Sequence, residues 1–324
     1  MRNILFFWMI LCYTFNVNAQ KLQFNQNKQF KIIQLTDIHY VAENKENSKM
    51  TQNFINEIIY NEKPDCVVFT GDIVVGKPIF EGWDAVLEPF IQNKIPYIIT
   101  LGNHDDEQDV ARPDIYRYIC EKPFCLNKKF TNKKNNDGVV PIYASESGNI
   151  ENLLYFIDTN SYTTCKGING YGWVTPQQIE QFTHNFERYS NKGKNDFSSF
   201  VFFHIPLPEY TEAYHNKDFK ATGVRLENEC SPVINTGLFS QMRLNGDVVG
   251  VFCGHDHNND YIASLHNIAL CYGRFSGSSN TYIDIEVGAR IILIEEGKRE
   301  FKTEIYLKDG KKQSFVTFTP LRYK

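Results

Sequence analysis

Five short stretches of this 324-residue chain carry side chains that could bind two metal ions. Together they offer two carboxylates, one amide oxygen and four imidazoles, with a fifth imidazole left over. Two divalent ions that share a bridging carboxylate need about this set of donors, and the combination is typical of a two-metal hydrolase. The stretches are Asp37-Ile38-His39, Gly71-Asp72, Gly102-Asn103-His104-Asp105, His204 and Gly254-His255-Asp256-His257.

Each stretch alone has an ordinary interpretation. A Gly-Asp pair after a strand is usually a turn, and a lone buried histidine is usually hydrogen-bonded in a core. Asp37 and His39 stand two residues apart, so at the end of a strand they share one face and can converge on one ion. The metal site is therefore predicted from the five stretches together, because convergent His and Asp clusters mark sites.

The elements before the stretches must bring these side chains together. Three buried strands are predicted over 30–35, 66–70 and 96–101, each ending just before one of the first three stretches. Helical patterns separate them, which makes a β-α-β-α-β order. Parallel strands arranged in this way present ligand sites at their carboxyl ends.

The helices have recognisable signals. The first helix is expected to be capped by Ser48 and to end at Pro64. The second is centred on residues 83–91, and Pro89 within it predicts a short or kinked helix. Thr175-Pro176 opens a further helix, since proline is tolerated in a first turn.

Further strands are expected over 153–157, 200–203 and 248–252, the last two each ending in a histidine motif. After Tyr261 the pattern changes to short β runs separated by glycine and charged turns. These runs are expected to form a second sheet that closes the fold without making a separate domain. The mature chain, 20–324, is therefore interpreted as a single domain.

The series D-x-H, G-D, G-N-H-D, H and G-H-x-H resembles the calcineurin-like metallophosphoesterase superfamily over roughly residues 30 to 260. Longer runs are similar to its purple-acid-phosphatase-related branch. One departure matters: His39 and Val75 stand where purple enzymes carry a glycine and the iron-binding tyrosine. A purple tyrosinate–iron site is therefore not expected. The longer runs are 34–39, 70–74, 170–173 and 203–206.

The resemblance implies a role for each matching residue. It implies an α/β sandwich of two mixed β-sheets flanked by helices, with two ions (Fe, Mn or Zn) as cofactors. Asp72 bridges both ions and so takes part in catalysis. His104 lies just outside the ligand shell, paired with Asp72, and assists transfer of the phosphoryl group or departure of the ester oxygen. Asp37, His39 and His257 complete the first ion's ligands, and Asn103, His204 and His255 those of the second.

The implied reaction is hydrolysis of a small phosphate ester by attack of a metal-bridging hydroxide. Phosphomonoesters are favoured as substrates. A phosphodiesterase acting on nucleotides or lipid headgroups is the alternative within the same chemistry, and a non-catalytic secreted metal-binding protein is the alternative outside it.

Several neighbours of the motifs have open interpretations. Asp105 or Asp106 either orients His104 or solvates its loop. Arg274 either reaches a substrate phosphate or is an ordinary turn cation. Tyr171 and Trp173, in a glycine-rich run, form either a wall of the cleft or a plug in the core.

The first 19 residues are typical of a secretory signal. Arg2 is followed by an apolar run over 4–13, which is short of the ~20 residues that cross a bilayer, and Val17-Asn18-Ala19 precedes Gln20 as a cleavage site. We therefore expect export to the periplasm or the medium, without stable membrane insertion. The formal net charge of -4 argues against binding to a nucleic-acid duplex.

Export permits disulfides, and seven cysteines remain after cleavage. Cys120 and Cys125 are close enough in sequence to close a small loop, and a disulfide between them is predicted. Cys66 and Cys253 lie in apolar runs and are expected to be buried thiols.

Overall fold

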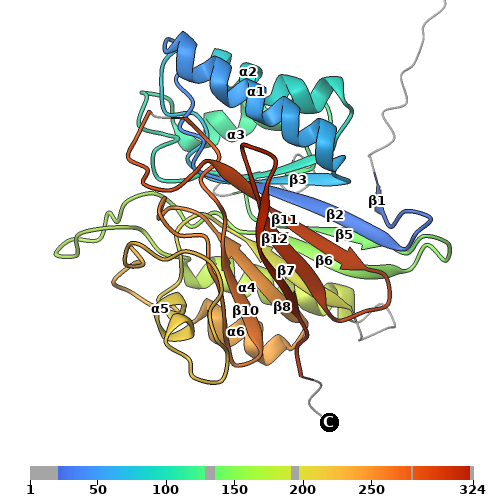
Figure 1. Ribbon diagram of the computed structural model, residues 1–324. Helices are drawn as coiled ribbons and strands as arrows, with labels where there is room; N and C mark the ends of the chain where they lie inside the picture. The colour runs from blue at the N-terminus through green and yellow to red at the C-terminus, as the bar shows by residue number, and fades with distance from the viewer. Residues whose placement is uncertain (1–20, 128–135, 191–196, 279, 322–324) are drawn as a thin grey trace, which may run out of the picture.

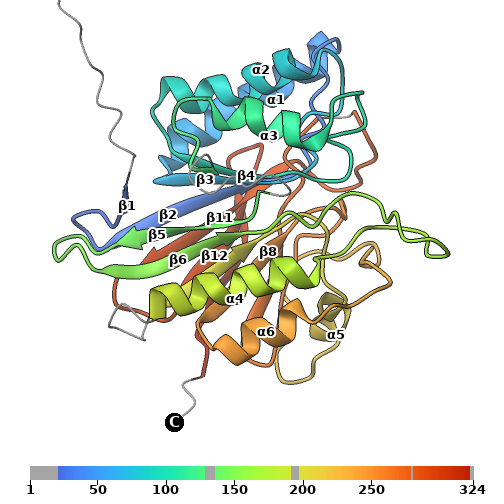
Figure 2. The same ribbon diagram turned by 180° about the vertical axis from the view of Figure 1, so that it is seen from behind.

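Two β-sheets pack face to face, and each carries helices on its outer face (Figures 1 and 2). The computed structural model describes residues 21–127, 136–190, 197–278 and 280–321. The signal segment predicted over 1–19 lies outside these residues. The predicted α/β sandwich of two mixed sheets is confirmed. Among the described residues, no helix is both long and apolar enough to cross a bilayer.

The six-stranded sheet contains the first three motif strands side by side. Its order is β13-β12-β11-β2-β3-β4, with β2, β3 and β4 parallel and β11 to β13 antiparallel. Helices α1, α2 and α3 cover its outer face. The elements are β2 (Gln29–Leu35), α1 (Lys45–Glu62), β3 (Cys66–Thr70), α2 (Ile79–Gln92), β4 (Tyr97–Thr100), α3 (Arg112–Cys120), β11 (Gly288–Glu295), β12 (Phe301–Leu307) and β13 (Lys312–Phe318).

The seven-stranded sheet contains the two histidine strands, β7 and β8, as parallel neighbours. Its order is β1-β5-β6-β7-β8-β10-β9, and helices α4 and α6 lie on its outer face. The elements are β1 (Leu22–Gln23), β5 (Gly138–Tyr143), β6 (Ile150–Phe156), α4 (Pro176–Ser190), β7 (Ser198–Phe202), α5 (Glu209–Tyr214), α6 (Leu238–Asn245), β8 (Val248–Cys253), β9 (Ile262–Leu265) and β10 (Ile268–Tyr272).

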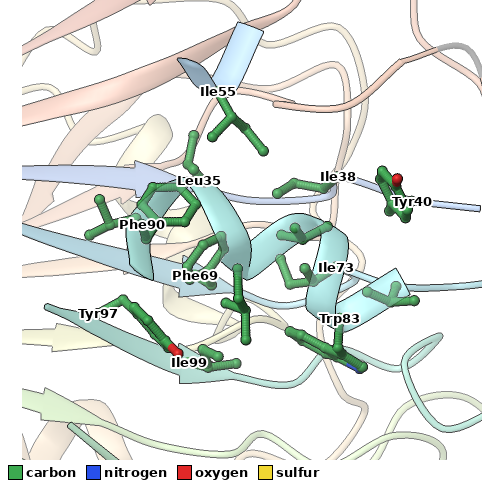
Figure 3. Close-up of a cluster of buried hydrophobic side chains, with 14 of the residues drawn as sticks. Leu35, Ile38, Tyr40, Ile55, Phe69, Ile73, Trp83, Phe90, Tyr97 and Ile99 are labelled. Atoms are coloured by element: carbon green, nitrogen blue, oxygen red, sulfur yellow. The ribbon is translucent and has the colours of Figure 1, made fainter. Parts of the chain in front are cut away.

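Side chains alternate between two cores along the central strands, as a period of two requires. In β3, Phe69 faces the helices while Val68 faces the opposite sheet. Figure 3 shows Phe69 and Ile99 beside Trp83 and Phe90 of α2. Burial on both faces explains why these strands are mostly apolar, and the candidate site residues lie beyond their carboxyl ends.

Two local expectations need correction. Helix α1 begins at Lys45, and the side chain of Asn44, not Ser48, caps it by accepting a bond from the backbone of Asn47. Ser48 lies inside the helix, and its hydroxyl donates to the carbonyl of Val41. Pro89 does not shorten α2, which runs for 14 residues and ends at Gln92, three residues after the proline.

The strands after Tyr261 do not form a second sheet of their own. β9 and β10 extend the sheet of the histidine strands, whereas β11 pairs with β2 at the centre of the other sheet. The C-terminal part of the chain therefore completes both sheets. The pairing of β11 with β2 joins segments far apart in the chain, so the local sequence pattern of either strand does not predict it.

The predicted Cys120–Cys125 disulfide is wrong: both residues are buried thiols in the structure. Cys120 ends α3, and Cys125 lies beside β4, where each packs into the core between the first sheet and its helices. Cys66 and Cys253 are buried thiols, as expected.

Candidate metal centre

Two groups of side chains meet where the carboxyl ends of strands from the two sheets come together. In each group the possible ligand atoms all lie within 4.8 Å of one another. Asp72, which follows β3, belongs to both groups. The first group is Asp37, His39, Asp72 and His257, and the second is Asp72, His204 and His255.

Asn103 joins the second group through its side-chain oxygen. Its Oδ1 lies 3.2 Å from Nε2 of His204, and the same Nε2 lies 3.2 Å from Oδ2 of Asp72 and 3.3 Å from Nδ1 of His255. All seven predicted ligands therefore converge. Five of them come from loops after β2, β3 and β8, and Asn103 and His204 come from the loops after β4 and β7.

The backbone turns sharply at four of these residues. Asp37, His39, Asp72 and His255 have φ values of 51°, 47°, 53° and 82°. This left-handed region is uncommon for residues other than glycine, and such strain persists only where the surrounding structure holds it. Here it turns each side chain back toward the junction of the two sheets.

Two motif glycines make room for the ligands. A Cβ atom on Gly102 would overlap the carboxylate of Asp72, and one on Gly254 would overlap Thr36 and the carboxylate of Asp37. The glycines that precede Asn103 and His255 are therefore required by close approach of neighbouring side chains.

Burial dominates the electrostatics of the site. It raises the pKa of Asp37 to about 7, an effect that His204 opposes and Asp72 reinforces. Burial also acts against ionisation of Asp72, but His204 and His39 outweigh it, and the pKa of Asp72 lies well below its usual value. Burial lowers the pKa of His39 to about 3 and that of His257 to about 4. Both rings are therefore neutral, which is the form that binds metal.

The residues fit a pair of cations. Nε2 of His39 is buried without a hydrogen-bond partner, and it faces Oδ2 of Asp72 at 3.7 Å. Nδ1 of His204 lies 2.7 Å from the carbonyl of Thr70, and Nδ1 of His257 lies 3.0 Å from that of Tyr282. A carbonyl only accepts, so each Nδ1 carries a proton. Each Nε2 faces a carboxylate of the site, that of Asp72 for His204 and that of Asp37 for His257, where a metal would bind it. Nitrogen and oxygen donors without sulfur suit Fe, Mn or Zn.

Comparison with known proteins agrees with this geometry. The model of the calcineurin-like phosphoesterase family matches residues 30–259.

The chain belongs to the calcineurin-like phosphoesterase family.

Individual relatives carry phosphatase names. The chain is 33% identical over 305 residues to the "Probable inactive purple acid phosphatase 14" of Arabidopsis thaliana, covering 81% of this chain and 74% of the relative. It is 32% identical to the "Phosphatase DCR2" of Saccharomyces cerevisiae, covering 80% of this chain and 50% of that protein. A dimetal phosphatase from Danio rerio has the same fold, with a TM-score of 0.65, 10% identity, and coverage of 90% of this chain and 99% of the other. The resemblance to the purple-acid-phosphatase-related branch is confirmed.

His104 lies in this phosphoesterase site but is not paired as expected. Its backbone N–H donates to Oδ1 of Asp72 at 2.8 Å, whereas its ring binds Glu107, with Nδ1 2.7 Å from Oε2. The ring centroid is 5.6 Å from that of His39. The side chain is 38% exposed, so it lies at the open side of an otherwise buried group.

Asp105 neither orients His104 nor solvates its loop. It is fully buried and accepts four backbone N–H bonds of 2.7–3.0 Å, from Asp72, Ile73, Val74 and Gly102. Asp105 therefore fixes the loop that carries Asp72 against the loop that carries Asn103. The neighbouring Asp106 lies 3.4 Å from Arg112 and likewise does not contact His104 through any bond described.

Arg274 does not reach toward a substrate. It is 3% exposed and forms an ion pair with Asp260 and a bond to the carbonyl of Glu286. Of the two interpretations left open for Arg274, neither a phosphate contact nor an exposed turn cation agrees with the structure, because its guanidinium is used inside the fold.

Tyr171 forms part of the wall of the site. Its ring meets that of His255 edge-on at 4.4 Å and stacks with Tyr162 at 5.8 Å. Trp173 is half-buried, and its carbonyl accepts a bond from Asn160. Glu107, Tyr162 and Tyr282 were not predicted from the sequence. Glu107 stands three residues after His104 and outside the motif, whereas the fold brings Tyr162 and Tyr282 to the site from distant loops.

Proposed function

We propose that the chain is an exported, two-metal phosphoesterase that hydrolyses small phosphomonoesters. The observation that carries the proposal is Asp72, whose carboxylate belongs to both groups of candidate ligands. One carboxylate shared by two ion sites is the arrangement that two-metal hydrolysis needs. Membership of the phosphoesterase family supports the chemistry, and the phosphatase names of relatives support the preference for monoesters.

In this proposal Asp37, His39 and His257 hold one ion, Asn103, His204 and His255 hold the other, and Asp72 bridges. When bound, two such ions supply the Lewis acidity that activates water and neutralises charge on the phosphoryl group. The protein contributes orientation. Thr70 and Tyr282 hold the rings of His204 and His257 in one tautomer, and burial keeps His39 and His257 neutral.

His104 acts on the substrate in this proposal. Nδ1 is used by Glu107, so Nε2 is the nitrogen available at the open side of the site. From there it donates a proton to the ester oxygen as that oxygen leaves. A phosphodiesterase would use the same residues. Rates measured on a panel of monoesters and diesters distinguish the two activities.

Export rests on the signal-like segment that ends at Val17-Asn18-Ala19. The mature chain is expected to begin near Gln20. Mass spectrometry of exported protein that finds an intact Met1 would disprove this part of the proposal.

The test compares His104→Asn with wild type and with His184→Asn, which changes an exposed histidine of α4. Elemental analysis is combined with rates on aryl and alkyl phosphomonoesters and on a matched diester. We expect two ions per chain in all three proteins. Loss of His104 should lower kcat on monoesters by ~10²–10⁴-fold. Hydrolysis of the diester alone would favour the phosphodiesterase, and bound metal without any hydrolysis would favour the metal-binding alternative.

A further inference from the structure

Glu107 holds the ring of His104 although it belongs to none of the motifs. It stands three residues after His104, and its Oε2 lies 2.7 Å from Nδ1 of the histidine. An ionised carboxylate only accepts hydrogen bonds, so the proton of this bond belongs to Nδ1. Nε2 is thereby left to face a substrate, because the carboxylate fixes the tautomer of the ring.

The second oxygen of Glu107 is used as well. The hydroxyl of Tyr162 donates to Oε1 of Glu107 at 3.1 Å, and it accepts a bond from Nδ2 of Asn103 at 3.2 Å. Because the amide nitrogen of Asn103 is engaged by Tyr162, its oxygen turns toward His204. A continuous chain of hydrogen bonds therefore runs from a candidate metal ligand through Tyr162 and Glu107 to His104.

The ring of His104 is consequently held from several sides. Asp72 fixes its backbone, Glu107 fixes Nδ1, and the ring of Tyr162 lies edge-on at 6.5 Å between centroids. Asp72 and Asn103 are both candidate ligands. The candidate ligands therefore fix the position of His104, directly through Asp72 and indirectly through Asn103, Tyr162 and Glu107.

Stability alone does not account for this arrangement. The side chains of His104 and Glu107 are 38% and 40% exposed, and an exposed ion pair contributes little to the stability of the folded protein. Positioning a catalytic group can matter far more, because a small displacement of such a group costs rate steeply.

We propose that Glu107 is a positioning residue that aims Nε2 of His104 at the leaving oxygen of the substrate. The inference rests on the proposed function. In the charged ring both nitrogens of His104 carry a proton. As the oxygen of water bonds to phosphorus and the ester P–O bond breaks, the Nε2 proton passes to the departing oxygen, and the neutral ring keeps its proton on Nδ1, facing Glu107. Glu107 stays a carboxylate throughout, and the proton released by the attacking water restores the charged imidazole.

The kinetic test compares Glu107→Gln with Asp109→Asn. Asp109 lies in the same loop, is exposed and pairs only with Lys77 in the contacts described, so this change removes the same charge without touching His104. We expect Glu107→Gln to lower kcat about 10- to 100-fold on alkyl phosphates, and less on aryl phosphates, whose leaving groups depart unaided. KM and metal content should stay as in wild type. Tyr162→Phe should cause a smaller loss of the same kind.

Rates for Glu107→Gln that equal those of Asp109→Asn would overturn the proposal, and so would an equal loss on all leaving groups. We expect Glu107→Asp, which keeps a carboxylate, to hydrolyse alkyl phosphates faster than Glu107→Gln and more slowly than wild type.

A readout independent of turnover is the ¹⁵N spectrum of the histidine rings, with the His104 signals assigned by their loss in His104→Asn. In the neutral ring of wild type we expect the proton on Nδ1, and in Glu107→Gln a mixture of tautomers. An unchanged tautomer in Glu107→Gln would refute the positioning role. If wild type hydrolyses no ester but the tautomer still depends on Glu107, the proposed function fails while the role of Glu107 in orienting His104 stands.

Discussion

Asp72 is the residue on which the whole site depends. Its Oδ2 faces His204 and His39, its Oδ1 accepts the backbone N–H of His104, and its own N–H donates to Asp105. Its backbone is also in the left-handed region. A single side chain thus links both candidate ion sites to the proposed proton donor.

Asp72→Asn keeps the size of the side chain and removes the negative charge that two ions would share. We expect the affinity for both ions to fall, since removal of the bridge weakens each site. Elemental analysis after gel filtration measures the loss, with Asp218→Asn, an exposed aspartate, as the matched control. Retention of two tightly bound ions in Asp72→Asn would show that the bridge lies elsewhere.

The valine at position 75 bears on the visible absorption spectrum of the iron-loaded protein. It stands where purple enzymes carry the tyrosine that binds iron, and its backbone N–H donates to the carbonyl of Tyr40. An aliphatic side chain cannot form the tyrosinate–iron bond, so the iron-loaded protein should lack an intense visible band. An absorption spectrum decides the matter, and a purple protein would require another tyrosine at the metal.

At the scale of elements, Arg112 ties the start of α3 to the ends of two strands. Its guanidinium donates to the carbonyls of Leu101 and Gly102 after β4, and to both oxygens of Asp158 after β6. These carbonyls immediately precede Asn103. The helix therefore anchors the loop that carries a candidate ligand and the proposed acid.

Arg112→Ala should cost about 3–5 kcal/mol of unfolding free energy, because it leaves the Asp158 carboxylate buried without its cation. Arg117→Ala is the control in the same helix: this arginine is 69% exposed, and its loss should stay within about 0.5 kcal/mol. Urea unfolding measures both. Equal, small effects in the two variants would mean that the Arg112 network adds nothing to stability.

At the scale of the molecule, the candidate ions join two sheets. The first sheet supplies the loops after β2, β3 and β4, and the second supplies those after β7 and β8. Ions that bind only the folded protein stabilise it by about 2.7 kcal/mol for each site filled at 100 times its Kd. We expect a chelator to lower Tm, and added Mn²⁺ to restore it. The same treatments should hardly change Tm in Asp72→Asn, and a Tm insensitive to chelation in wild type would contradict metal binding.

The buried carboxyl of Asp137, between Asp158 and Gln178, makes stability depend on pH. Burial raises its pKa to about 7 in the folded protein, against ~3.9 when unfolded. The folded state thus holds the proton more tightly, so this group stabilises most at low pH and its contribution falls as pH rises from about 4 to 7. Asp137→Asn should therefore raise stability by up to about 4 kcal/mol at pH 8, and by only about 1.5 kcal/mol at pH 5. Urea unfolding at both pH values tests this against Asp114→Asn, and a gain equal at both would exclude Asp137 as the source.

The sequence by itself determined the parts of the site that depend on local order. Asp37, Asp72 and Asn103 each follow a strand that is mostly apolar and buried, so their position at a sheet edge follows from the pattern of burial. Spacing within the motifs placed His39 beside Asp37 and His257 beside His255. Family resemblance covered the same residues, and the structure brings all seven together.

Only the tertiary structure decided what surrounds them. Tyr162 meets Asn103 and Glu107, and Arg112 meets Asp158, through loops whose paths depend on long-range packing. Arg274 forms a buried ion pair for the same reason. Pairing of β11 with β2 is likewise a register between distant segments. The packing of the two sheets determines which side chains become neighbours across them, and the periodicity of a local sequence does not predict that packing.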